Sequence, residues 1–152
     1  MNNFNEFGAW LKAARAAEDT KFEKSRSQVR DFLRQHGIAK VVVSFDGEGD
    51  DGSITDCKYE PATPDFGKTP VPGTEDKRYG YNAQHEWVAV DRCATIDEII
   101  DDMFYAFLSS NEPGWEINEG SYGDITLDVL TGKIKLHCCR RIVAVDEMEG
   151  EF

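Results

Sequence analysis

The sequence lacks any apolar run of the roughly 18–20 residues that a membrane-spanning helix needs. It also lacks a cationic N-terminus followed by an apolar block, which argues against a secretory signal. Its four cysteines contain no CxxC pair, so zinc-finger spacing is absent. Cys138 and Cys139 are adjacent and would point to opposite faces of a strand, where they cannot easily bridge each other. We therefore expect a cytoplasmic protein with reduced thiols and no membrane association.

Positive charge is scarce outside the N-terminal arm. The 152 residues carry a net charge of −12, but residues 1–40 hold eight Lys/Arg against five Asp/Glu, which is +3. Residues 41–152 therefore hold nine Lys/Arg against 24 Asp/Glu, which is −15. Because affinity for phosphates comes mainly from cationic side chains, direct nucleic-acid binding by this acidic body is disfavoured. A basic protein surface is the partner that the charge favours.

Length and hydrophobic patterning predict one α+β domain over residues 1–152. Apolar residues at three- and four-residue spacing predict helices over residues 5–35 and 95–109, with a break or an exposed stretch across 18–27 in the first. Strands are expected over 40–45, 54–60 and 85–91. The fold expected is an antiparallel sheet of about five strands with the N-terminal and second helices packed on one face, in the order α-β-β-β-α-β-β.

The connections are predicted from their composition. Residues 46–53 read as a long acidic loop between two strands. Residues 61–84 hold four of the five prolines and read as a long irregular loop. Near the C-terminus, a turn at Thr131-Gly132 would place Leu127 opposite Leu136 and Ile125 opposite Cys138, with all apolar pairs on one face. Residues 146–152 read as a solvated acidic tail.

The segment Gly47–Gly52 formally matches the dinucleotide-binding pattern GxGxxG, but it leads into a predicted strand rather than a helix. Its carboxylates would also repel a pyrophosphate. It does not fit a calcium-binding EF-hand loop, because Asp51 falls at the glycine position and Cys57 at the closing glutamate position. A solvated acidic turn explains the segment better.

Gly114–Asp128 combines aromatic and polar residues in a glycine-bearing connection, which is typical of binding surfaces. The competing interpretation is that Trp115 closes the core beneath the helix end. The candidate binding residues of both segments are Asp46, Glu48, Asp50, Asp51, Trp115, Asn118, Glu119, Tyr122 and Asp124.

Catalysis has little support in the sequence. A metal-dependent hydrolase would need Asp46, Asp50, Glu119 and Asp124 to converge, which is unspecific among 29 acids. His137 lies beside Cys138, but neighbours on a strand face apart, so nucleophilic catalysis by that pair is disfavoured. We expect no catalytic residues, no resident metal and no cofactor.

Both segments resemble an uncharacterised family, the domain of unknown function 6878. The similarity rests on Phe45-Asp46-Gly47-x-Gly49-Asp50-x-Gly52-x-Ile54 and on Gly114-Trp115-Glu116-x-Asn118-Glu119-Gly120-x-Tyr122-Gly123, with Thr126, Asp128 and the ending Glu151-Phe152. It spans roughly Val29 to the C-terminus. The resemblance implies no activity, but it implies that the two segments share one surface.

The leading hypothesis is a non-enzymatic acidic interaction protein. In this hypothesis a phage or mobile-element inhibitor occupies a basic, nucleic-acid-binding surface of a host protein. The alternative is a metal-binding module or metal-dependent hydrolase that uses the carboxylates of loops 46–52 and 114–124. A third hypothesis is a structural subunit whose exposed aromatic residues form a homodimer interface.

Overall fold

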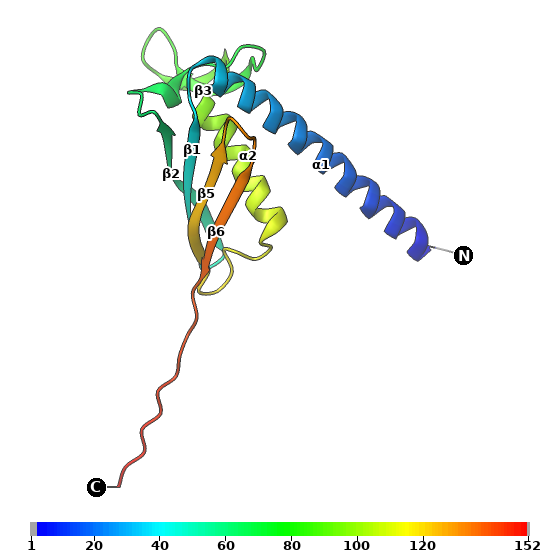
Figure 1. Ribbon diagram of the computed structural model, residues 1–152, viewed down its shortest axis with the longest axis vertical. Coiled ribbons are helices and arrows are strands. Elements are labelled where there is room, and N and C mark those ends of the chain that lie inside the picture. Colours follow the sequence, from blue (N-terminus) through cyan, green and yellow to red (C-terminus); the bar gives the residue numbers. More distant parts are fainter. Residues whose placement is uncertain (1–2, 152) are drawn as a thin grey trace.

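The computed structural model describes residues 3–151. Figure 1 shows a four-stranded sheet with helices on one side. The elements in chain order are α1 (Asn3–Gln35), β1 (Lys40–Glu48), β2 (Asp51–Glu60), the short 3₁₀ helix η1 (Phe66–Lys68), β3 (Asp76–Tyr81), β4 (Trp87–Arg92), α2 (Ile96–Asn111), β5 (Ser121–Asp128) and β6 (Ile134–Arg140).

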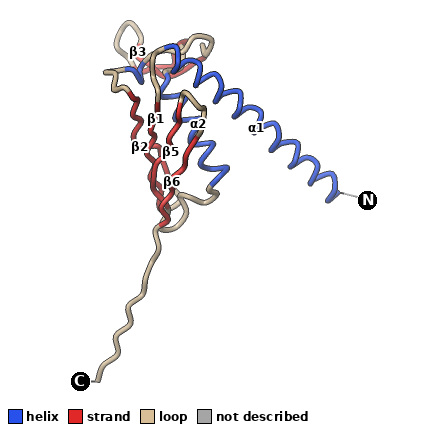
Figure 2. The backbone as a smooth tube through the Cα atoms, viewed as in Figure 1, coloured by secondary structure: helices blue, strands red, loops and turns tan. Residues whose placement is uncertain are grey.

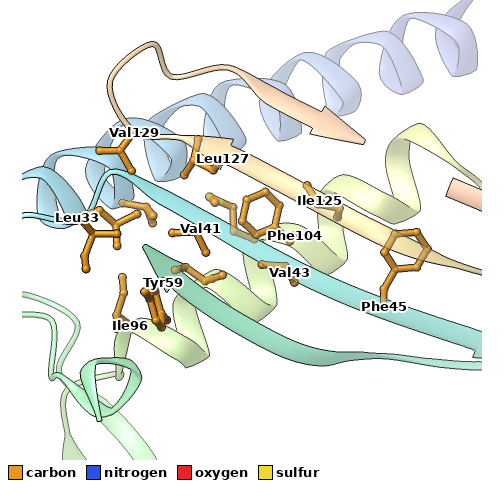
Figure 3. Packing of buried hydrophobic residues seen from close by; sticks show 14 of the residues in the cluster. Leu33, Val41, Val43, Phe45, Tyr59, Ile96, Phe104, Ile125, Leu127 and Val129 are labelled. Atoms are coloured by element: carbon orange, nitrogen blue, oxygen red, sulfur yellow. The ribbon is translucent and has the colours of Figure 1, made fainter. Parts of the chain in front are cut away.

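The four-stranded sheet is antiparallel throughout and has the order β2-β1-β5-β6. Alternate residues of its strands point into one core, where α2 and the C-terminal half of α1 cover them (Figure 3). The largest fully buried side chains of this core are Trp115, Phe45, Phe104, Leu33, Ile96, Ile100, Leu108, Ile125, Leu127, Val41, Val43 and Val129. The helices therefore leave the opposite, outer face of the sheet without a helical layer.

The α+β fold class is confirmed, with one difference in the sheet. Instead of one sheet of about five strands, β4 pairs with β3 in a separate two-stranded sheet. The sequence prediction missed β3 because it opens with Asp76, Lys77 and Arg78, so its apolar alternation is weak. Arg78 and Arg92 from this hairpin both reach Glu98 in the first turn of α2, at 3.5 and 2.8 Å.

The first helix is continuous from Asn3 to Gln35, so the stretch around residues 18–27 contains no break. No glycine or proline lies within residues 18–27. Glu23 and Lys24 are exposed, which agrees with the exposed stretch that was the other expectation. Figure 1 shows that the N-terminal part of α1 projects away from the body.

The predicted acidic loop 46–53 is instead almost entirely β-structure. β1 continues to Glu48 and β2 begins at Asp51, so only Gly49 and Asp50 form the turn. Both have positive φ, 60° and 65°, which is the conformation of a type I′ hairpin turn. Composition predicts a loop here because acidic residues at exposed strand positions give the same polar composition as a loop.

The C-terminal hairpin forms, but its predicted register is wrong by two residues. Leu127 pairs with Ile134 and Ile125 pairs with Leu136. The turn is longer because the Asp128 carboxylate accepts hydrogen bonds from the backbone N–H groups of Leu130 and Thr131, both at 3.0 Å. A shift of two residues preserves the face on which each side chain lies, so the predicted inward face is correct.

The segment after β6 has no regular structure and extends away from the body (Figure 2). Among the described residues, no helix has the length and apolar character needed to cross a membrane.

Candidate functional site

The two glycine-bearing acidic segments meet at one end of the sheet. The backbone N–H of Gly49 donates to the carbonyl of Asn118 at 2.8 Å, and that of Asp50 donates to the carbonyl of Glu116 at 2.9 Å. The β1–β2 turn is therefore hydrogen-bonded along the connection between α2 and β5. This adjacency is what the resemblance implied.

Glycines at this junction make room for Trp115, which is 2 % exposed. A Cβ at Gly47 would lie 2.7 Å from the indole, and one at Gly52 would lie 2.4 Å from it. Phe45 and Tyr105 contact the same indole edge-on, at 5.6 and 5.7 Å between ring centroids. Trp115 is thus a core residue, and its assignment to the binding surface is corrected.

Gly120 brings two backbones into direct contact. A Cβ there would lie 1.6 Å from the carbonyl oxygen of Gly47, and the φ of Gly120 is +71°. Both the close approach and the left-handed conformation demand glycine. Packing accordingly explains Gly47, Gly52 and Gly120 of the family motif.

Arg141 lies at the surface of this junction and binds to β1. Its guanidinium donates to Asp46 Oδ1 at 2.8 Å and to the carbonyl oxygen of Gly47 at 3.1 Å. It also lies 4.9 Å from the ring centroid of Tyr122. The hydrogen bond to Asp46 raises the pKa of Arg141, so this candidate carboxylate is engaged by a permanent cation.

Four further carboxylates lie exposed at this end of the body. Within residues 3–151, none of them has an ion-pair partner within 4.0 Å. We call this set the acidic end, and its members are Glu48, Asp50, Asp51 and Glu119. Asn118, another candidate, is exposed beside them with a φ of +57°.

The predicted hydrolase carboxylates do not assemble into a metal site. In the described part of the chain, no three His, Cys, Asp or Glu side chains are grouped closely enough to hold a metal ion. Asp46 is paired with Arg141, and Asp124 accepts a hydrogen bond from Ser44 Oγ at 2.9 Å. The geometry thus offers paired or solvated carboxylates at these positions.

The outer face of the sheet brings together polar and thiol side chains that the sequence analysis did not group. Strand pairing places Asp124 of β5 between Ser44 of β1 and His137 of β6. The next row places Tyr122 opposite Cys139. The two-residue periodicity of a strand could have found this pair, because residues 137 and 139 share a face whereas 137 and 138 do not.

His137 and Cys139 contact each other on this face. The Cys139 Sγ lies 3.8 Å from the His137 Nε2, within hydrogen-bonding reach of sulfur. The other histidines have no comparable neighbour: His36 Nδ1 lies 2.9 Å from the carbonyl of Phe32, and His85 occupies the β3–β4 turn.

A hollow of about 820 Å³ lies between α1 and α2. Its lining includes apolar side chains of both helices, among them Phe22, Met103 and Phe107. Its charged lining residues are Glu23, Arg26 and Asp102, which do not form a catalytic or metal-binding set.

The fold is an α+β domain with an acidic end and an open sheet face. Residues 22–152 match the model of a family of unknown function, DUF6878, and the chain belongs to this family. The match begins at Phe22, which packs on Phe107 of α2, and it continues through the C-terminal segment. No curated protein and no solved structure matches the chain.

Proposed function

We propose that this chain is a non-enzymatic acidic interaction protein that binds a basic surface of a protein partner through its acidic end. The observation that carries the proposal is the set of four exposed carboxylates without ion-pair partners among the described residues. Charges without intramolecular partners are free to meet cations of a partner, and they steer its diffusional approach.

The C-terminal segment adds to this charge. It leaves the body at Arg141, whose backbone N–H donates to the carbonyl of Gly120 at 3.0 Å, beside the acidic end. Exposed acidic side chains follow at Asp146, Glu147, Glu149 and Glu151. Exposed aliphatic side chains precede and interrupt them, including Ile142 at 87 % and Val145 at 80 % exposure. Aliphatic anchors among acids fit a partner groove that has an apolar floor and a basic rim.

The charge of the acidic end indicates which kind of protein surface it would bind. Surfaces rich in Lys and Arg that accept a string of negative charges are those that bind nucleic acids. The proposed role is therefore that of an inhibitor from a phage or mobile element, acting in the cytoplasm, which occupies the nucleic-acid-binding surface of a host protein. The chain itself would not bind nucleic acid, since residues 41–152 carry −15.

Affinity capture from host lysate, followed by competition with DNA, tests this proposal. The wild-type chain is compared with a site variant that removes the four unpaired charges: E48Q, D50N, D51N and E119Q. A matched control variant removes four exposed charges elsewhere on the body: D31N, E86Q, D91N and D102N. A captured protein is then mixed with double-stranded DNA, with and without the chain.

The proposal predicts that the control variant captures the same protein as the wild type and that the site variant does not. It also predicts that DNA and the chain exclude each other from the captured protein. Equal capture by both variants, or a ternary complex with DNA, would contradict it.

A further inference from the structure

The outer sheet face carries a thiol beside an imidazole, and what this pair could do does not depend on the proposed function. We propose that Cys139 is a site of covalent modification by small uncharged electrophiles, with His137 as its general base. Both residues come from β6, an edge strand of the four-stranded sheet, so the pair can be approached from the open face and from the edge.

The His137 Nε2 lies 3.8 Å from the Cys139 Sγ, close enough to accept the thiol proton. The two side chains share one face because they are two residues apart on a strand. His137 is exposed, so the proton it receives can pass to solvent.

The pKa of each of the other three thiols is raised, which favours its protonated form. Burial raises the pKa of Cys57 to about 12. Burial and a hydrogen bond from its Sγ to the Glu75 carboxylate at 3.4 Å raise the pKa of Cys93. Burial also raises the pKa of Cys138, whose side chain points to the opposite face of β6. Since the thiolate is the reactive form, the raised pKa disfavours the reaction at each of these three thiols.

The surroundings determine which electrophile fits. Tyr122 lies directly across from Cys139 on β5, and Asp124 lies across from His137. Arg141, a cation near the pair, lies over the Tyr122 ring and is already paired with Asp46. With a net charge of −12, the protein as a whole repels anions as they approach. An uncharged reagent is therefore favoured over an anionic one.

The reaction is a displacement in which all atoms and electrons are accounted for. His137 takes the proton from Sγ, and the sulfur lone pair forms a bond to the electrophilic carbon. The bond from that carbon to its leaving group breaks, and the leaving group departs with the electron pair. The imidazolium then returns its proton to solvent.

Alkylation with iodoacetamide, followed by peptide mass spectrometry, tests the proposal on the full chain. We expect Cys139 to be alkylated first at pH 7, ahead of the other three cysteines, because the raised pKa of each of those thiols lowers its thiolate fraction. Anionic iodoacetate should alkylate Cys139 more slowly than iodoacetamide does, and the ratio of the two rates should be larger than the ratio measured with free cysteine.

The H137Q variant separates the role of the base from simple exposure of the thiol. It keeps a polar side chain at an exposed position, so the fold should be retained, which circular dichroism would verify. Cys139 should then react at least about tenfold more slowly at pH 7, and the difference from the wild type should disappear at about pH 10, where hydroxide can take the place of the imidazole as the base. Lys135→Gln, on the same face of β6, serves as the matched control and should leave the rate unchanged.

Two results would overturn the proposal. One is alkylation of Cys93 or Cys138 as fast as that of Cys139 in the wild-type chain. The other is an unchanged rate and pH profile of Cys139 in the H137Q variant.

Discussion

The packing of Trp115 against glycine is the most sharply testable feature of the fold. A Cβ at position 52 would lie 2.4 Å from Cη2 and 2.6 Å from Cζ3 of Trp115. Carbon atoms in contact need about 3.5–4.0 Å, so the indole would have to move by about 1 Å within a close-packed interior. Overpacking of this kind costs about 1–3 kcal/mol. We expect Gly52→Ala to lower the free energy of unfolding by about 2–3 kcal/mol.

Urea unfolding of the variant and its controls measures this loss. Gly49→Ala is the matched control in the same hairpin: its φ is +60°, but nothing lies within 4 Å of its Cβ, so it carries only the backbone cost of about 1–2 kcal/mol. In a Trp115→Leu background, which removes the ring atoms that clash, Gly52→Ala should cost about 1 kcal/mol or less. The double-mutant cycle therefore yields a coupling of 1 kcal/mol or more.

A cost for Gly52→Ala that is the same with and without the Trp115 indole would refute this reasoning. It would mean that the glycine is needed for backbone conformation or for function rather than for the space that the indole occupies. The structural explanation of the shared family motif would then fail at this position.

Two further predictions concern stability. The raised pKa of Cys57, about 12 against an ordinary 9.0, means that the unfolded chain releases the thiol proton first. The stability that the protonated Cys57 thiol contributes is therefore complete below pH 9.0 and is lost as the pH rises towards about 12. The Tm should fall across that window more steeply in the wild type than in Cys57→Ala. Parallel curves of Tm against pH for the two proteins would contradict this cause. Arg30→Met removes the hydrogen bond from Nε to the Val129 carbonyl at 2.6 Å. It should cost about 1–2 kcal/mol in urea unfolding, whereas Lys24→Met, at an exposed position of the same helix, should cost less than about 0.5 kcal/mol.

Local sequence signals predicted those elements whose own residues determine them. The second helix could be placed because its apolar face and its N-cap are encoded within it: the backbone N–H of Glu98 donates to the Thr95 hydroxyl at 3.3 Å. The inward face of the C-terminal hairpin followed from two-residue alternation. Its register did not, because Asp128 bonds to two turn N–H groups and lengthens the turn by an amount that alternation cannot detect.

The candidate site also has features that the sequence predicted and features that depend on tertiary contacts. The adjacency of its two segments was implied by the family resemblance and is realised through the Gly49 and Asp50 backbone hydrogen bonds. The burial of Trp115 depends on space left by Gly47 and Gly52, which is a tertiary contact and carries no local pattern. The pairing of Asp46 with Arg141 joins residues 95 positions apart, so composition alone left that carboxylate among the free ones.

The β3–β4 hairpin shows a further limit of sequence interpretation. Tyr79 and Trp87 stack on its outer side at 6.3 Å between centroids, and they are 62 % and 60 % exposed. Aromatic residues normally signal a core, yet here Arg78 and Arg92 fix the hairpin through Glu98 while the rings remain in solvent. These ion pairs link the hairpin to α2, and hydrophobic alternation does not reveal them.

The most direct test of the proposed acidic-end interface is the salt dependence of binding to the captured partner. The dissociation constant of the wild type, the site variant and the control variant is measured between about 50 and 200 mM salt. The proposal predicts that affinity of the wild type and the control variant falls steeply with salt. The site variant should bind at least about tenfold more weakly at low salt, with a shallower dependence. Equal affinities and equal salt slopes for the site and control variants would contradict the claim that these four carboxylates form the interface.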